Sequence, residues 1–164
     1  MGFKISRSQA LIEVITQFPI TELPIQEFEE YKRECIDYDD VPAPPIQIQL
    51  AHPAHIETIG RDKLMERPVE ARGEELHHVH IWQEGCCWED GDGLLVQWAS
   101  TSDSYVVYSY FIDRDKDHHF YVIDYCNDKA HALIEDKQQV AEWTRQAQEF
   151  RVKNIRSEER RVGK

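Results

Sequence analysis

The sequence predicts a single compact α+β domain: an antiparallel sheet of three to four strands, two helices before it and one after it. Two observations predict this class. Apolar residues recur at helical spacing near both ends of the chain, whereas short runs rich in β-branched and aromatic residues fill the middle. A length of 164 residues fits one domain, and 41% hydrophobic residues suffice for a core. We expect the helices to pack on one face of the sheet.

The first third of the chain predicts a strand, two helices and a loop. "FKIS" fits a short strand, and the helical pattern that follows ends at Pro19. Pro24 suits the first turn of a second helix. The apolar face of that helix consists of Ile25, Phe28, Tyr31 and Cys35. Four prolines in residues 37–55 then predict an extended loop, with "IQIQL" as an edge strand.

The second half predicts the sheet and the last helix. We expect the segment "IGRDKLMER" to be a loop before the sheet. The expected strands are "ELHHVHIW", "GLLVQWAS", "SYVVYSYFI" and "HHFYVIDYC". Short turn-forming links between them favour antiparallel hairpins. Asp136 is a candidate cap for the final helix, whose apolar stripe consists of Val140, Trp143, Ala147 and Phe150.

The charge of the chain limits its partners. A formal net charge of −12 repels polyanions at long range, so we do not expect direct binding to DNA or to naked nucleic acid. Residues 145–164 carry seven basic and three acidic side chains, a net charge of +4, which leaves −16 on the first 144 residues. This basic end is either a solvated, frayed tail or an arm that contacts an acidic partner.

The sequence also predicts a cytoplasmic protein without a membrane segment. No apolar run approaches the roughly 18 residues of a membrane span, and the N-terminus lacks the apolar core of a signal peptide. The four cysteines should then be reduced, and none has a CxxC spacing.

The most distinctive stretch is "HHVH". In a strand, His78 and His80 point to one face, and His77 points to the other. A zinc site needs three or four ligands, and no further Cys or His lies at ordinary spacing, so we expect no metal. Paired imidazoles suit acid–base catalysis. Strand histidines without a chemical role remain the alternative.

Residue spacing alone also leaves the roles of other short segments undecided. Ser102 and Asp103 in "TSDS" are typical of an ordinary turn, and Arg61 and Asp62 of a surface pair. No P-loop, GxSxG, HExxH or dinucleotide fingerprint is present.

The order of six short motifs is more specific. "FEEYKRE", "IGRDKLME", "LHHVHIW", "STSDSYVVYSYF", "FYVIDYCNDKAHAL" and "AQEFRVKN" follow one another over about residues 27–154. In this order they resemble the YafO family of type II toxins. The resemblance implies one toxin-like domain over residues 1–154, and it leaves residues 155–164 as a basic C-terminal tail.

The resemblance implies a compact RelE-like fold and a ribosome-dependent mRNA endonuclease that inhibits translation. A cognate antitoxin would bind and silence it, and the ribosome and mRNA would be its other partners. Enzymes of this kind need no metal or other cofactor, because the 2′-hydroxyl of the RNA attacks the neighbouring phosphate. The protein supplies a base, an acid and positive charge.

Residues that match the family pattern become site candidates. His78 or His80 would act as base or acid, with His131 as the competitor. Asp103 would orient a histidine or carry a proton. Candidates for contact with RNA or its phosphates are Arg61, Arg151, Ser102 and, more weakly, Tyr108.

The charge of −12 opposes approach to RNA, so two other classes stay open. One is a non-enzymatic acidic inhibitor or decoy that binds a basic protein. The other is a RelE-like toxin with a protein target. The discriminating feature is whether the candidate cations and imidazoles converge on one concave patch; these residues are Arg61, His78, His80, His131 and Arg151.

Overall fold

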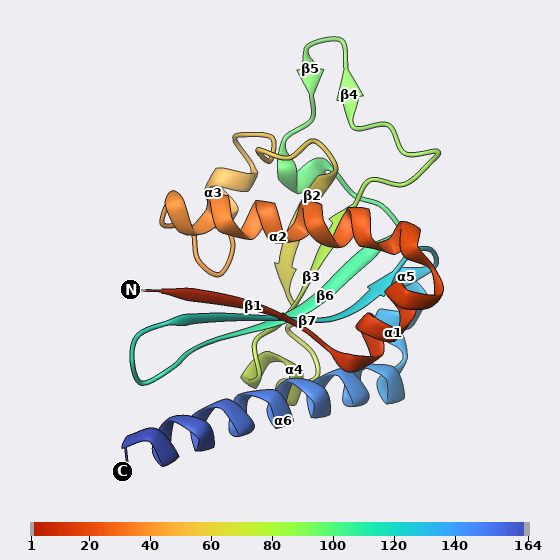
Figure 1. The fold of residues 1–164 in the computed structure, drawn as a ribbon. Helices are drawn as coiled ribbons and strands as arrows, with labels where there is room; N and C mark the ends of the chain where they lie inside the picture. Colours follow the sequence, from red (N-terminus) through yellow and green to blue (C-terminus); the bar gives the residue numbers. More distant parts are fainter. Residues whose placement is uncertain (1, 163–164) are drawn as a thin grey trace.

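A mixed sheet of five strands forms the centre of the molecule (Figure 1). The computed structural model describes residues 2–162, with side chains as far as residue 155. Across the sheet the strands are β1 (Phe3–Arg7), β7 (His118–Cys126), β6 (Tyr105–Ile112), β3 (Leu76–Ile81) and β2 (Ile59–Leu64). β1 is parallel to β7, and the other neighbours are antiparallel. The α+β class is confirmed, but the sheet is mixed and larger than expected.

Helices cover both faces of the sheet, so the expectation of helices on one face is wrong. α1 (Gln9–Gln17), the 3-10 turn η1 (Pro19–Thr21) and α2 (Glu22–Asp37) lie on one side (Figure 1). α6 (Lys137–Val162) lies on the other, with α4 (Val69–Gly73) and α5 (Ala130–Glu135). β6 explains the arrangement: Val106 belongs to the first core and Val107 to the second. A strand that is apolar on both faces needs cover on both.

Local sequence explains the ends of the predicted helices. The Ser8 hydroxyl accepts a hydrogen bond from the Leu11 N–H at 3.0 Å and so caps α1. Pro24 lies in the first turn of α2, as predicted, where a backbone N–H has no helical partner. Asp136 caps α6 as predicted, because its carboxylate accepts the Gln138 N–H at 3.0 Å.

Three segments differ from expectation. "IQIQL" forms the short helix α3 (Ile46–Gln49) instead of an edge strand. "GLLVQWAS" forms only the two-residue strand β5 (Gly93–Leu94), paired with β4 (Glu89–Asp90), and the turn η2 (Gln97–Ala99). "IGRDKL" is β2, not a loop.

Close backbone packing explains the position of β2. A Cβ on Gly60 would lie 2.1 Å from the Ser100 carbonyl oxygen, so only glycine lets β2 lie against the segment after η2. The buried Gln97 amide donates to the Gly60 carbonyl at 3.0 Å and to the Tyr31 hydroxyl at 2.8 Å. These side-chain bonds hold the 97–100 segment in a turn where the apolar pattern predicted a strand.

The C-terminal helix passes through the expected domain boundary at residue 154 and ends at Val162. The side chains of residues 156–164 lie outside the described residues, so the basic tail stays a prediction. Of the helices between residues 2 and 162, none combines the length and apolar character that a membrane crossing requires. All four cysteines are free thiols.

Candidate active site

The three histidines of β3 divide between the two faces of the sheet, as strand alternation predicts. The rings of His78 and His80 lie on the same face, with centroids 5.6 Å apart. His77 lies on the opposite face and stacks on the Tyr108 ring at 5.0 Å. Both of its ring nitrogens are buried without a hydrogen-bond partner. His77 therefore belongs to the core, and His78 and His80 to a surface hollow.

This hollow is an open pocket of about 510 Å³, hereafter the histidine pocket. Residues from β2, β3, α5 and the segment leading into β6 line it: Arg61, Lys63, His78, His80, Thr101, Ser102, Tyr105, His131 and Ile134. Five of the residues expected at the site thus meet there, although they span 71 positions of the sequence from 61 to 131. Within the described residues, no three His, Cys, Asp or Glu side chains are arranged to hold a metal ion.

His80 is held by the backbone of Ser102. The Ser102 N–H lies 2.8 Å from His80 Nδ1, and the Ser102 carbonyl oxygen lies 3.0 Å from the same atom. The neutral ring can therefore accept from the N–H through a bare Nδ1, or donate to the carbonyl through Nδ1–H. The first tautomer leaves a proton on Nε2, and the second leaves Nε2 free to accept one. Burial lowers the pKa of His80 to about 4.

His78 is even less basic. Burial, followed by the neighbouring His80, lowers the pKa of His78 to about 3, and its Nδ1 has no hydrogen-bond partner among the described residues. The Tyr105 ring packs against both imidazoles, with centroids 4.8 Å from His78 and 4.5 Å from His80. At neutral pH the pocket therefore presents two uncharged imidazoles fixed by an aromatic ring.

Two cations border these imidazoles. The Arg61 guanidinium lies over the Trp98 ring at 4.6 Å, and its Nε donates to the Trp98 carbonyl at 2.7 Å. Lys63 pairs directly with His78 across the ladder between β2 and β3. Arg61 and Lys63 share a face because they are two residues apart in a strand. The sequence did not indicate Lys63 or Tyr105 as site residues. If "IGRDKL" had been interpreted as a strand, alternation would have placed Lys63 on the same face as Arg61.

The loop before β6 fixes the backbone of the residue that carries the third imidazole, His131. The Asp103 carboxylate accepts the backbone N–H of His131 at 2.7 Å, and the Asp103 carbonyl accepts that of Ala130 at 3.0 Å. Asp103 therefore anchors the first turn of α5 and contacts the backbone of His131, not an imidazole. The His131 side chain is 70% exposed and lies 3.2 Å from the Glu135 carboxylate, so it is the solvated member of the group.

Tyr108 lies on the far side of the sheet from the histidine pocket. Its hydroxyl donates to Asp62 at 2.6 Å, and the buried Lys32 ammonium contacts the same carboxylate at 2.6 Å. Burial alone would raise the pKa of Asp62, but Lys32, His77 and the hydrogen bonds from Lys32 and Tyr108 hold it below its ordinary value. The motif residues Lys32, Asp62 and Tyr108 thus form a buried ion-pair network behind the pocket.

Arg151 also lies apart from the residues that line the histidine pocket. Its Nε and Nη2 atoms each donate to the Glu74 carboxylate at 2.9 Å. These hydrogen bonds raise the pKa of Arg151 and join α6 to the end of α4. The two-point contact expected with a phosphate is made here with a carboxylate of the same chain.

The histidine pocket can accept and donate protons at imidazole nitrogens and can neutralise an anion between Arg61 and Lys63. A family model described as "Toxin YafO, type II toxin-antitoxin system" matches residues 29–152. The match includes every residue that lines the pocket. Neither a curated protein nor a solved structure matches the chain.

Proposed function

This chain belongs to the YafO family of toxins from type II toxin–antitoxin systems, and from this we propose that it is a ribosome-dependent mRNA endonuclease. Its activity would stop translation, and the antitoxin of the pair would silence it. The histidine pocket is the proposed active site. The reaction is attack of a 2′-hydroxyl on the adjacent phosphate, which needs proton transfer and charge neutralisation but no protein nucleophile.

The observation that carries the proposal is the convergence of four of the five residues expected to meet. Arg61, His78, His80 and His131 line one open pocket, and Lys63 adds a second cation to it. The chain as a whole carries −12, so these two cations form a local exception. At short range a local basic site outweighs a distant net charge, because screening limits charge effects to about 8 Å in physiological salt.

The proton transfers follow from the state of the imidazoles. A neutral His80 with Nδ1–H bonded to the Ser102 carbonyl presents a bare Nε2, which would take the proton of the 2′-hydroxyl. As the O2′–P bond forms, the P–O5′ bond breaks, giving a 2′,3′-cyclic phosphate. His131 or His78 would give a proton to the leaving O5′, giving a 5′-hydroxyl.

Burial is the main cause of the low pKa values of His78 and His80, and a bound phosphate would oppose it. A phosphate bound beside them brings a negative charge, which favours the imidazolium and raises both pKa values. Arg61 and Lys63 would then stabilise the charge that develops on the phosphorane oxygens. Substrate binding would thus tune the imidazoles toward the working pH.

The test is cleavage of one defined mRNA in a purified translation system. We expect cuts only while ribosomes translate the message, with a cyclic phosphate at each new 3′ end. His80→Ala should abolish cleavage, and His78→Ala should weaken or abolish it. His77→Phe is the matched control, since it changes the same strand on the opposite face and should cut normally.

Growth arrest in cells gives the second measurement. If the chain stops growth while mRNA stays intact, the nuclease proposal fails and the protein-target alternative takes its place. If the variant lacking both His78 and His80 remains fully toxic at equal abundance, the histidine pocket is not the active site.

A further inference from the structure

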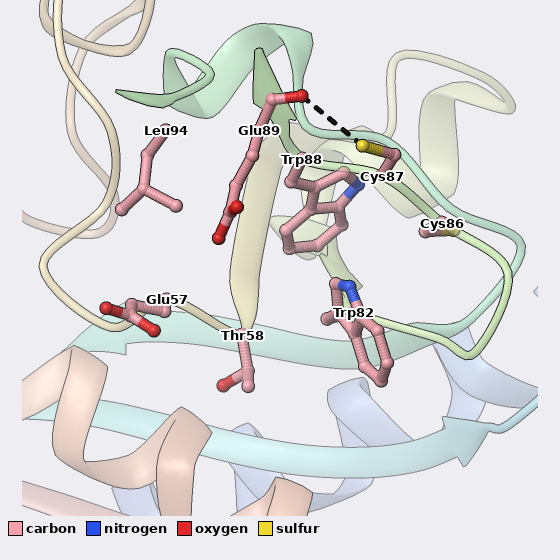
Figure 2. Close-up of a pocket in the computed structure, with 8 residues that line it drawn as sticks. All are labelled: Glu57, Thr58, Trp82, Cys86, Cys87, Trp88, Glu89 and Leu94. Carbon is pink, nitrogen blue, oxygen red and sulfur yellow. Dashed lines mark hydrogen bonds between the residues drawn. The ribbon is translucent and has the colours of Figure 1, made fainter. Parts of the chain in front are cut away.

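A second hollow lies beside β4 and β5 and shares no lining residue with the histidine pocket. We call it the tryptophan pocket; Figure 2 shows its lining side chains. Its volume is about 370 Å³. The residues that matter are Glu57, Thr58, Trp82, Trp88, Glu89 and Leu94. The proposed nuclease reaction uses none of them.

Two indole rings form one wall of the tryptophan pocket (Figure 2). Trp82 is 46% exposed, so a large part of its indole ring is accessible to a ligand. Trp88 is buried, and its indole N–H donates to the Thr101 carbonyl at 2.8 Å. That bond fixes the ring and occupies its only hydrogen-bond donor. The aromatic face that the wall offers to a ligand is therefore mainly that of the exposed Trp82 ring.

The opposite side of the tryptophan pocket is acidic. The Glu57 and Glu89 carboxylates line it, and neither has a hydrogen-bond or ion-pair partner in the described part of the chain. The Thr58 hydroxyl donates to the carboxylate of Glu27, which brings a third acid close. Residues 82–94 contain four acidic residues and no lysine or arginine. Such a site repels phosphate and attracts a cation.

Indole faces opposite carboxylates suit an arginine or lysine side chain. The planar guanidinium or the ammonium stacks on the ring and pairs with the acids, and its aliphatic stem covers apolar surface such as Leu94. A chain of net charge −12 also draws its protein partners through their basic segments.

We propose that the tryptophan pocket binds an arginine or lysine side chain of the antitoxin. This inference rests on membership of a family with an antitoxin partner, not on the nuclease reaction. The position also suits silencing. Thr101 lines the histidine pocket and holds the Trp88 ring, so a segment bound in the tryptophan pocket lies close to the wall of the proposed active site.

The experiment measures tryptophan fluorescence during titration with hexa-arginine amide or hexa-citrulline amide. Citrulline keeps the shape of arginine but lacks its charge, so we expect hexa-arginine to bind at least about tenfold more tightly, the factor that 1.4 kcal/mol produces. Glu89→Gln should weaken binding roughly tenfold, and Trp82→Ala at least as much. Glu13→Gln removes one carboxylate from α1 and is the matched control, which should bind like the parent.

A second titration uses the toxin–antitoxin complex co-expressed from its own gene pair. We expect the arginine peptide to cause no quenching there, because the antitoxin fills the pocket. Quenching equal to that of the free toxin would refute the antitoxin as occupant. Equal binding of the arginine and citrulline peptides, or equal weakening by Glu13→Gln and Glu89→Gln, would refute a cation site.

An RNA titration separates this proposal from the nuclease. Quenching by a short single-stranded RNA that Trp82→Ala abolishes would assign the tryptophan pocket to the substrate and overturn the antitoxin proposal. None of these readouts requires cleavage, so their failure leaves the nuclease proposal intact, and failure of the nuclease leaves this test valid.

Discussion

Lowering the pH from 7.5 to 5.5 should cost the folded protein about 4 kcal/mol, because three histidines of β3 are neutral in the fold. Burial lowers the pKa of His77 to about 4, of His78 to about 3 and of His80 to about 4, from an ordinary value of 6.5. Between these values the unfolded chain binds protons that the folded chain does not. Unfolding free energy therefore falls as the pH drops through 6.5, and it goes on falling to about pH 4 for His77 and His80 and to about pH 3 for His78.

The size of the effect follows from the shifts. One pH unit below the ordinary pKa, each histidine that stays neutral in the fold contributes a loss of about 1.4 kcal/mol, and the three together about 4 kcal/mol. This is a large part of the 5–15 kcal/mol that typically stabilises a domain. The pKa of Asp62 lies below its ordinary value, so its contribution stays constant over this pH range.

His77→Phe isolates one third of this loss. The phenyl ring preserves the stack on Tyr108, and no hydrogen bond disappears because both nitrogens of His77 lack partners. Urea denaturation followed by circular dichroism at both pH values gives the two unfolding free energies. We expect the loss between pH 7.5 and 5.5 to shrink from about 4 to about 3 kcal/mol in the variant. A parent protein equally stable at both pH values, or an unchanged loss in His77→Phe, would refute the reasoning.

Three further outcomes are expected. Lys63→Met should slow mRNA cleavage about 10–100-fold without moving the urea midpoint, because it removes a cation from the phosphate site; unchanged cleavage would exclude Lys63 from the mechanism. Lys32→Met should lower the unfolding free energy by about 3–5 kcal/mol, since Asp62 then stays buried without its cation, and adding Asp62→Leu should recover part of the loss in the same denaturation assay. Asp103→Ala should increase hydrogen exchange in the first turn of α5 around His131 at a cost of about 1 kcal/mol; protection equal to the parent's would contradict the anchoring role.

The features that the sequence predicted correctly depend on the alternation of side chains along a strand and on contacts between residues close in sequence. The separation of His77 from His78 and His80 required only that β3 be a strand, because alternation is a local property. The start of α6 at Asp136 likewise depends on one side chain and the backbone just after it.

The missed features depend on distant partners. β2 looked like a loop because Arg61, Asp62 and Lys63 are all charged. Asp62 is buried because distant residues pair with it, among them Lys32, 30 residues earlier. Arg151 looked available for phosphate, but Glu74, 77 residues away, takes its guanidinium. No local spacing reveals such pairs, since they form only when the sheet brings separate elements together.

The buried ion pair between Lys32 and Asp62 also fixes the register of β2 relative to β3. If β2 moved by one residue relative to β3, its side chains would exchange faces. Asp62 would leave Lys32 buried without a counter-charge, and Arg61 and Lys63 would enter the core. Breaking a buried pair costs about 3–5 kcal/mol even before two new cations lose their water. The cost of burying unpaired charges thus excludes the misaligned form. Asp62, on one face of β2, thereby keeps Arg61 and Lys63 on the other face, next to the imidazoles.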